Sequence, residues 1–312
     1  MIHKPVGDSH SGFTMAPPST LLARMRRSMI CRLARHFPGL VHRRASAAAR
    51  SMGIDDLFMV VSFDCDTERD FDVVEELVQW LADRDVPAVL AVPGELLKRG
   101  ATVFRSLADS VGEFINHGYR EHTVYKGGAY EPTLFYHLLP ASEVVDDIIA
   151  GHESLESVLG ITPGGFRAPH FGTIRDPARL ELIRGVLLEL GYGFSSSTMP
   201  EQALLRGPLY DAGGFVEFPL TGTWDRPLVP LDSWGFRVSE TGYFQPDEFE
   251  IQFAKLLRYY KQRQLPGLLN IYVDPSQVWD FPPFFKSVEL ALEHGVTFVT
   301  YSDLLRKTKE SR

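Results

Sequence analysis

The sequence contains little cysteine and no long apolar run. Its 312 residues include two cysteines, Cys31 and Cys65, too few for a disulfide framework, so we expect a reducing compartment. No apolar stretch approaches the roughly 20 residues of a membrane-spanning helix, and the N-terminus lacks the apolar core of a standard secretory signal. These absences predict a cytoplasmic protein.

Acidic residues are almost absent from the first part of the chain. The chain has 32 basic and 40 acidic residues, of which nine basic residues and one acid, Asp8, lie within residues 1–53, leaving 23 against 39 for the remainder. We therefore expect two parts, a basic N-terminal extension at 1–54 and an acidic domain at 55–312. The acidic domain argues against nucleic acid as a partner.

The extension itself divides into two segments. Residues 1–20 are rich in Pro, Gly and Ser and are predicted to be disordered. Residues 20–50 have the pattern of an amphipathic basic helix. Such a helix either adheres to an anionic membrane surface, which would place the protein at the membrane, or packs on the domain as a solvated helix. An unstructured start is the third alternative.

Short apolar runs alternate with segments of helical periodicity beyond the extension. About seven apolar runs predict strands, beginning with residues 57–63 and including 87–92, 112–116 and 268–273. Repeated β–α units predict a parallel sheet with helices outside it. With this number of strands we expect a closed or partly closed barrel. No glycine-rich phosphate-binding motif follows the first strand, which argues against a dinucleotide-binding fold.

Side chains that can bind a metal ion or transfer a proton lie at the ends of the predicted strands. Asp64 and Asp66 end the first strand on the same side, because side chains alternate along a strand. His117, Arg167 and Asp274 end three later strands. In (β/α) barrels these ends converge on one rim, where active sites lie. Since two close carboxylates repel each other, we expect a cation or a shared proton between the two acids.

Two histidines after the third predicted strand indicate a divalent metal ion. On a regular helix, the five-residue spacing of His117 and His122 would leave their side chains about 140° apart. Either residues 118–119 form a loop that lets both histidines reach one ion, or Glu121 is the ligand instead. We favour His122. Arg167, followed by Ala-Pro, is placed to orient a carboxylate through paired hydrogen bonds.

These segments, in this order, resemble the polysaccharide deacetylase family (NodB homology domain, carbohydrate esterase family 4-like). The segment 62–66 is similar to its Phe-Asp-x-Asp motif, 117–122 to its His-Ser/Thr-x-x-His motif and 167–169 to its Arg-x-Pro motif. The resemblance covers residues 57–305 and implies a distorted (β/α) barrel that carries a divalent metal ion, most often Zn²⁺. It also implies the roles of four residues: metal ligands Asp66, His117 and His122, and general base Asp64, which Arg167 orients.

The chain departs from the family's late Leu-x-x-His-Pro segment. Asp274 occupies the place of the histidine that acts as general acid. An Asp with an ordinary pKa of about 3.9 donates protons poorly at neutral pH, so burial or a nearby carboxylate has to raise its pKa. Alternatively, His170 supplies the proton, or the chemistry has been lost or changed.

The resemblance implies a hydrolase that removes an N-acyl group, acetyl above all, from an amino sugar of a glycan or glycan precursor. A carbohydrate is then the expected substrate, with Pro169, Trp224 and Trp234 as candidate contacts. Two alternatives remain: hydrolysis of another C–N bond, in a ureide or cyclic amide, and a non-catalytic glycan-binding relative.

Overall fold

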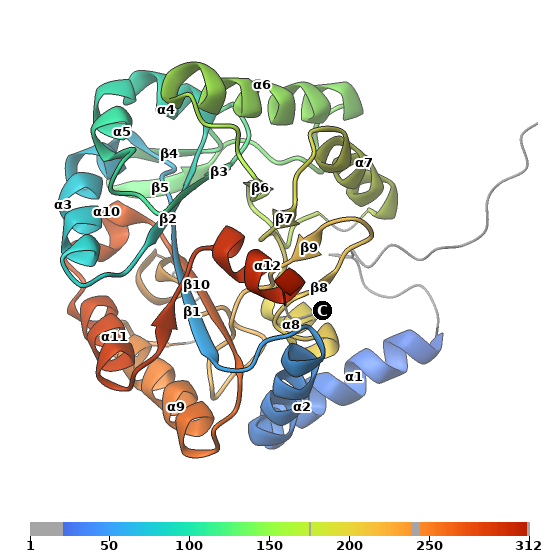
Figure 1. Ribbon diagram of the computed structural model, residues 1–312. Coiled ribbons are helices and arrows are strands. Elements are labelled where there is room, and N and C mark those ends of the chain that lie inside the picture. The colour runs from blue at the N-terminus through green and yellow to red at the C-terminus, as the bar shows by residue number, and fades with distance from the viewer. Residues whose placement is uncertain (1–20, 175, 239–243, 311–312) are drawn as a thin grey trace, which may run out of the picture.

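The computed structural model describes residues 21–174, 176–238 and 244–310; the disorder predicted for residues 1–20 lies outside these ranges. Within them, a curled sheet of nine strands has the order β10–β1–β2–β3–β6–β7–β9–β8, with β11 beside the start of β1. Helices surround the sheet (Figure 1). The predicted α/β architecture, a distorted (β/α) barrel, is confirmed.

All strands of the main sheet run parallel except β8, which is antiparallel to β9. Strand β1 is buried along its whole length, as expected for a parallel strand covered on both faces. The strands are β1 (Leu57–Asp64), β2 (Ala88–Val92), β3 (Glu113–Asn116), β6 (Gly165–Phe166), β7 (Phe194–Ser195), β8 (Tyr210–Asp211), β9 (Val216–Glu217), β10 (Gly267–Val273) and β11 (Thr297–Phe298). A separate antiparallel hairpin consists of β4 (Thr123–Lys126) and β5 (Ala129–Pro132).

Two helices precede the first strand, and the others follow strands along the chain; most of them cover the outside of the barrel. They are α1 (Leu21–His36), α2 (Pro38–Ser51), α3 (Phe71–Ala82), α4 (Gly94–Arg99), α5 (Ala101–Leu107), α6 (Ala141–Leu159), α7 (Pro177–Glu189), α8 (Pro200–Arg206), α9 (Glu248–Gln262), α10 (Pro275–Val278), α11 (Pro282–Glu293) and α12 (Tyr301–Glu310), with short turns η1 (Glu68–Asp70) and η2 (Trp234–Val238). Among the described helices, none is long and apolar enough to cross a bilayer.

Asn270 closes the barrel where no ladder joins β9 to β10. Its carbonyl accepts the N–H of Thr221 at 2.8 Å, and its side-chain amide donates to the carbonyls of Phe218 and Pro219 at 2.9 and 3.1 Å. The hydroxyl of Tyr301 donates to its side-chain oxygen at 2.7 Å. The backbone and side chain of this one buried residue thus supply hydrogen bonds to the segment after β9 where no strand ladder is present.

Helix α2 of the N-terminal extension packs on the barrel. Val41, Ala45 and Ala49 are buried, and Ala49 joins the same apolar cluster as Phe58 of β1. Helix α1 packs on its neighbours through Ile30 and shares an apolar cluster with residues of α2 and α8. The extension is therefore helical through residues 21–51, apart from Phe37, and its second helix belongs to the packed structure.

Helix α12 covers the end of the barrel where the strands begin, near the viewer in Figure 1. Glu113, the first residue of β3, accepts the backbone N–H of Tyr301 at 3.0 Å and the hydroxyl of Ser302. Burial outweighs these bonds and raises the pKa of Glu113 to about 7. The opposite end, where the strands finish, is left open for a site.

Glu113 predicts a pH-dependent contribution to stability. Because its pKa is about 7 in the folded protein against an ordinary 4.5, the folded state holds the proton more tightly than the unfolded state. The stabilisation is complete below pH 4.5 and is lost as the pH rises to about 7. Relative to Glu113→Gln, the wild type should lose up to about 3 kcal/mol across this range. Urea unfolding at several pH values measures this, and parallel pH profiles for the two proteins would contradict it.

Candidate active site

Asp64 and Asp66 stand side by side where β1 ends. The N–H of Cys65 donates to the carbonyl of Ala91 in β2 at 2.9 Å, which keeps the chain extended past the strand. The side chain of Cys65 therefore turns into the core, where it is fully buried. The two carboxylates lie on the other side and line one cavity, as the alternation of the sequence predicts.

The side chain of Arg167 forms a buried ion pair with Asp64. Its side chain is completely buried, and one terminal nitrogen, Nη1, lies 2.6 Å from Oδ1 of Asp64. The other, Nη2, donates to the hydroxyls of Ser62, Ser196 and Tyr301 at 2.9, 3.2 and 2.8 Å. Burial disfavours the charged guanidinium, but the charge of Asp64 more than compensates and raises the pKa of Arg167. Asp64 is thus fixed beside a permanent positive charge.

The segment between the two histidines is a loop, not a helix. Gly118 has φ of +78°, and a Cβ there would lie 2.5 Å from Oδ2 of Asp147, so only glycine fits. The buried carboxylate of Asp147, from α6, accepts the backbone N–H groups of Tyr119 and Arg120 at 3.1 and 3.0 Å. It also accepts the hydroxyl of Tyr136 at 2.7 Å. These hydrogen bonds fix the conformation of the loop between the two histidines, and we call them the Asp147 clamp.

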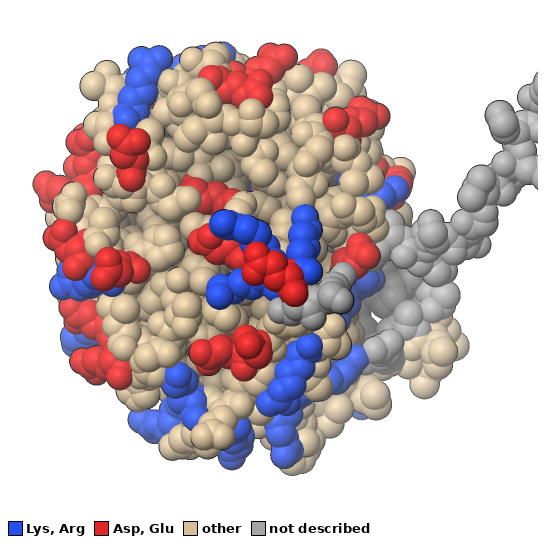
Figure 2. Space-filling model, in the orientation of Figure 1, with Lys and Arg blue, Asp and Glu red and all other residues tan. Residues whose placement is uncertain are grey.

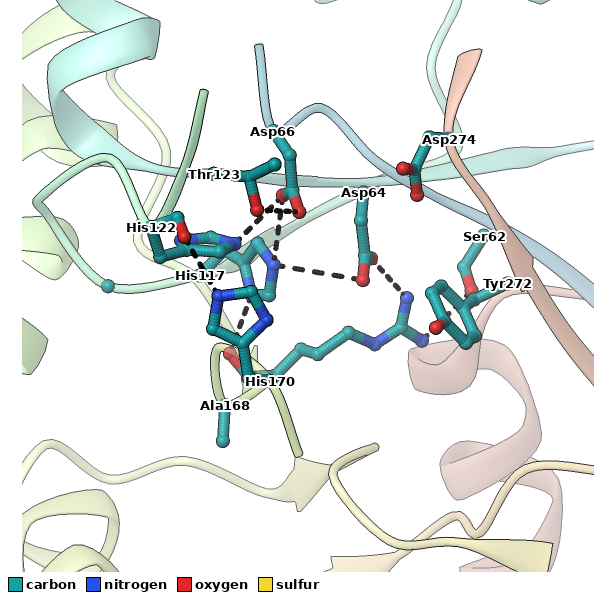
Figure 3. Close-up of polar contacts among 12 residues, drawn as sticks. Ser62, Asp64, Asp66, His117, His122, Thr123, Ala168, His170, Tyr272 and Asp274 are labelled. Carbon is teal, nitrogen blue, oxygen red and sulfur yellow. Dashed lines mark hydrogen bonds and ion pairs between the residues drawn. The ribbon is translucent and has the colours of Figure 1, made fainter. Parts of the chain in front are cut away.

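Asp66, His117 and His122 form a group whose potential ligand atoms all lie within 4.8 Å of one another (Figure 3). Oδ1 of Asp66 lies 3.3 Å from Nε2 of His117 and 3.0 Å from Nε2 of His122. His117 donates its Nδ1–H to the carbonyl of Arg167 at 2.8 Å, which leaves Nε2 free to accept or ligate. Burial opposes ionisation of Asp66, but His122 and His117 together hold its pKa well below the usual range.

This group fits a divalent metal ion. Both ring nitrogens of His122 and Oδ1 of Asp66 are buried and, among the described residues, make no hydrogen bond of good geometry, although these atoms lie close to one another. Buried polar atoms in such an arrangement are suited to a shared ligand. Two imidazoles and one carboxylate are the donors that Zn²⁺ accepts in sites with an open position. Asp66, His117 and His122 could therefore hold such an ion.

Glu121, the alternative ligand, lies outside the group. Its carboxylate pairs with Arg99 of α4, and its backbone N–H donates to the side chain of Glu95 at 2.8 Å. The loop thus turns Glu121 away from Asp66 and brings His122 toward it, which agrees with the alternative that the sequence favoured.

Asp274 lies on the other side of Asp64 from the histidines (Figure 3). It follows β10 directly, and the side-chain amide of Gln277 donates to its Oδ2. Burial raises the pKa of Asp274 well above its usual range, and the charges of Asp66 and other nearby carboxylates add to this rise. A raised pKa is the property that the sequence analysis requires of an Asp that donates a proton from this place.

His170 lies beside the histidine pair. It adopts a positive φ of 45°, a backbone conformation uncommon for residues other than glycine. Its Nε2 lies 2.8 Å from the carbonyl of His122, so this nitrogen carries the hydrogen. Burial, and then the neighbouring His122, lower its pKa to about 4. His170 therefore supports the position of His122.

The site opens into a cavity of about 430 Å³, a size typical of small-molecule sites. Asp64, Asp66, His117, His122 and Asp274 all line it. Apolar and aromatic residues make up much of the remaining lining, which includes Phe135, Phe171, Met199, Val229, Pro230, Trp234 and Tyr272.

The three candidate substrate contacts have different positions. Trp234 lines the cavity as expected. Trp224 does not: its ring stacks on His42, with centroids 5.4 Å apart, because the adjacent Asp225 is bonded to α9 outside the barrel. Pro169 is buried and lies close to Gly118. The positions of Trp224 and Pro169 differ from the sequence prediction and indicate packing roles.

Asp147 is the site residue that the sequence prediction missed. A signal for it existed, because Asp147 falls on the same face of the α6 segment as Val144, Ile148 and Gly151, all of which are buried. A carboxylate on the apolar face of a helix requires partners. Here those partners are the backbone and side chains around the histidine loop.

Replacing Asp147 tests this clamp. Asp147→Asn should weaken Zn²⁺ binding about tenfold, because an amide cannot accept all of these hydrogen bonds and the histidine loop loosens. Equilibrium dialysis measures the affinity. Glu143→Gln is the matched control, since it removes a surface carboxylate that pairs with the same Arg120. Unchanged affinity in a folded Asp147→Asn protein would rule out the clamp.

No family model matches the sequence, and no curated protein matches it either. The structure, in contrast, is similar to solved structures. A presumed polysaccharide deacetylase from Mycobacterium smegmatis matches with TM-score 0.62 and 20% identity, over 83% of this chain and 91% of its own. One from Pseudomonas aeruginosa PAO1 matches with TM-score 0.64 and 13% identity, over 84% and 94%.

An allantoinase, PuuE, matches with TM-score 0.58 and 13% identity, over 82% of this chain and 90% of its own. At these identities the similarity establishes the fold. The predicted resemblance is confirmed at that level: this chain has the fold of polysaccharide deacetylases, which the allantoinase shares.

Proposed function

We propose that the protein is a metal-dependent hydrolase that removes an N-acyl group, most readily acetyl, from an amino sugar of a glycan or glycan precursor. One observation carries the proposal: a carboxylate held by a buried arginine, Asp64, shares a cavity with the group of Asp66, His117 and His122. Deacetylases of the same fold support the choice of substrate class.

Asp66, His117 and His122 are the proposed ligands of a divalent ion, preferably Zn²⁺. When bound, such an ion polarises a carbonyl group and lowers the pKa of water. The chain itself keeps the ligands ready: the carbonyl of Arg167 fixes the ring of His117, and Asp147 fixes the loop that carries both histidines. Nearly complete burial of the two histidines limits competing solvent.

Asp64 is the proposed general base. Arg167 donates to Oδ1, while Oδ2 lies 3.7 Å from Nε2 of His117, beside the proposed ligands. A water molecule at this place can pass its proton to Asp64 as its oxygen attacks the acyl carbon. Because the carboxylate is already oriented, little reorganisation accompanies the transfer.

Asp274 is the proposed proton donor to the leaving nitrogen. The C–N bond breaks as this nitrogen takes the proton, so the products are a carboxylic acid and a free amine. Asp274 faces the cavity across from the histidines, and its burial favours the protonated form. His170 suits the role less well, because its Nε2 is engaged with the carbonyl of His122.

The aromatic wall of the cavity is the proposed sugar-binding surface. Trp234 and Phe171 present aromatic surface to the cavity, and the ring of Phe171 lies 5.2 Å from that of Tyr272. Aromatic faces bury the apolar surface of a pyranose ring well. A carbohydrate is therefore the proposed partner.

A second candidate is hydrolysis of another C–N bond, in a ureide or cyclic amide. The carboxylic acid at Asp274 favours it, and an allantoinase has the same fold. Screening acetylated amino sugars against small cyclic amides separates the two activities. The oriented base at Asp64 argues against a purely sugar-binding protein, because binding alone requires no such arrangement.

Separate substitutions of the two first-strand acids test the roles. Asp64→Asn should reduce the rate of acetate release from N-acetylhexosamine substrates by a factor of about 100 or more, while the protein retains bound Zn²⁺. Asp66→Ala should lose the metal as well. Metal analysis and acetate assays measure both, with Asp72→Asn as a surface control. Full acetate release by Asp64→Asn would contradict the assignment.

We also propose that the N-terminal extension, residues 1–54, contacts an anionic membrane surface through α1. Six large apolar side chains in this extension are exposed, although apolar residues usually pack inward. The exposed residues are Leu21, Leu22, Met25, Met29, Phe37 and Leu40. Arg32, Arg35 and Arg43 are also exposed on these helices, and a basic amphipathic helix of this kind binds anionic lipid.

The charge distribution supports this orientation. Figure 2 shows Lys and Arg side chains gathered along the lower margin of the viewed face, near α2 and α9. Anionic lipid would attract this basic margin. The protein would then act at the cytoplasmic side of a membrane.

Vesicle binding tests the membrane contact. The protein should sediment with phosphatidylglycerol vesicles but not with phosphatidylcholine vesicles, and salt should weaken the binding. The triple substitution Leu21→Gln, Leu22→Gln, Met25→Gln should reduce binding at least about tenfold. Leu138→Gln, at an equally exposed site outside the extension, is the control. Equal binding by both variants would contradict the proposal.

A further inference from the structure

A second cavity, of about 690 Å³, adjoins the catalytic one. Trp234 lines both cavities. The second cavity differs in chemistry, because two arginines stand among aromatic and hydroxyl side chains. It is lined by Arg69, Tyr125, Tyr130, Trp234, Arg237, Ser276 and Asp280, among others.

The β4–β5 hairpin runs past both cavities. Thr123 and Pro132, which are paired across the hairpin, line the catalytic cavity. Tyr125 and Tyr130, the pair two residues further along, line the second cavity. Two residues of a strand span about 7 Å, so one substrate molecule can occupy both cavities. The Gly-Gly turn at 127–128, with positive φ at both residues, is suited to such a tight hairpin.

Gln277 is a second link between the two cavities, in addition to the β4–β5 hairpin. Its side-chain amide donates to Oδ2 of Asp274 in the catalytic cavity, while the residue lines the second cavity. The neighbouring Ser276 is hydrogen-bonded to the hydroxyl of Tyr130 at 2.8 Å. The proposed proton donor therefore directly precedes α10, the short helix whose Ser276 and Gln277 line the second cavity.

Arg69 carries a positive charge that no carboxylate neutralises at close range. Its guanidinium lies 3.9 Å from the ring centre of Tyr125 and donates to the hydroxyl of Tyr130 at 3.1 Å. Within the described parts of the chain, no ion pair within 4.0 Å joins Arg69 to a carboxylate. Asp280 lies on the lining of the same cavity, and its pKa is lowered by its hydrogen bond with Arg237 and, to a smaller extent, by the charge of Arg69. Arg237, in contrast, is paired with Asp280 and donates to a backbone carbonyl.

An arginine held over an aromatic ring and hydrogen-bonded to a second one has its planar guanidinium group restrained. This geometry suits the paired oxygens of a phosphate or a carboxylate. The hydroxyls of Tyr130 and Ser276 lie beside it and are hydrogen-bonded to each other. The cavity is thus built for an anionic group and, through its aromatic side chains, for the ring that carries this group.

We propose that the second cavity binds an anionic substituent, a phosphate or a carboxylate, on the substrate whose acyl group occupies the catalytic cavity. This inference rests on the proposed function for its substrate class. Arg69 is then a specificity-determining residue: it recognises the charge, and it takes no part in the chemical step.

Calorimetric titration tests this without any turnover. The probes are N-acetylglucosamine 1-phosphate, N-acetylmuramic acid, which carries a carboxylate, and neutral N-acetylglucosamine. At least one anionic sugar should bind the wild type about tenfold more tightly than the neutral sugar, and the better of the two identifies the anion. Arg69→Gln should abolish this advantage and leave the affinity for the neutral sugar unchanged.

Arg84→Gln is the matched control, because Arg84 also lies 3.9 Å from an aromatic ring, that of Trp80, but outside both cavities. It should retain the preference for the anionic sugar. Equal affinity of the wild type for all three sugars, or a preference that survives Arg69→Gln, would overturn the proposal. Acetate release is assayed separately on the neutral sugar, and its absence would refute the proposed function while leaving the binding result intact.

Discussion

The buried ion pair between Arg167 and Asp64 is the interaction on which the site depends. Burying a guanidinium costs several kcal/mol of free energy unless an opposite charge lies beside it and its N–H groups have hydrogen-bond acceptors. Here Asp64 supplies the opposite charge, and the hydroxyls of Ser62, Ser196 and Tyr301 accept hydrogen bonds. These partners come from β1, from the end of β7 and from α12, so the barrel has to close correctly for the pair to form.

The same arginine also organises the proposed metal ligands. Its carbonyl accepts the Nδ1–H of His117, while its side chain fixes Asp64. The proposed base and one proposed metal ligand are therefore positioned by the side chain and the backbone of one residue. Asp66 follows two residues after Asp64, on the same side of the chain, and thereby meets both histidines. This shared support explains how two carboxylates are tolerated at one strand end: one faces a guanidinium and the other faces imidazoles.

Much of this arrangement is predictable from sequence, because it follows from periodicity. Alternation places Asp64 and Asp66 on one side, and β–α repetition brings their strand end to the same rim as Arg167 and Asp274. The position of His122 depends on the loop conformation at Gly118, which the sequence left open between two alternatives.

Features that depend on long-range contacts were not predictable. Asn270 closes the barrel through carbonyls about 50 residues away, and Asp147 reaches the histidine loop from another helix. Trp224 stacks on His42 of the N-terminal extension, a contact that no local pattern indicates. The hairpin at 123–132 was also missed, although its Gly-Gly turn is a recognisable signal.

The central claim is that Asp66, His117 and His122 hold one divalent ion beside the Arg167–Asp64 pair. Anomalous diffraction from crystals grown with Zn²⁺ tests it most directly. We predict a single strong peak about 2 Å from a carboxylate oxygen of Asp66 and from a ring nitrogen of each histidine, with Asp64 still on Arg167. A peak elsewhere, or none at saturating Zn²⁺, would contradict the account.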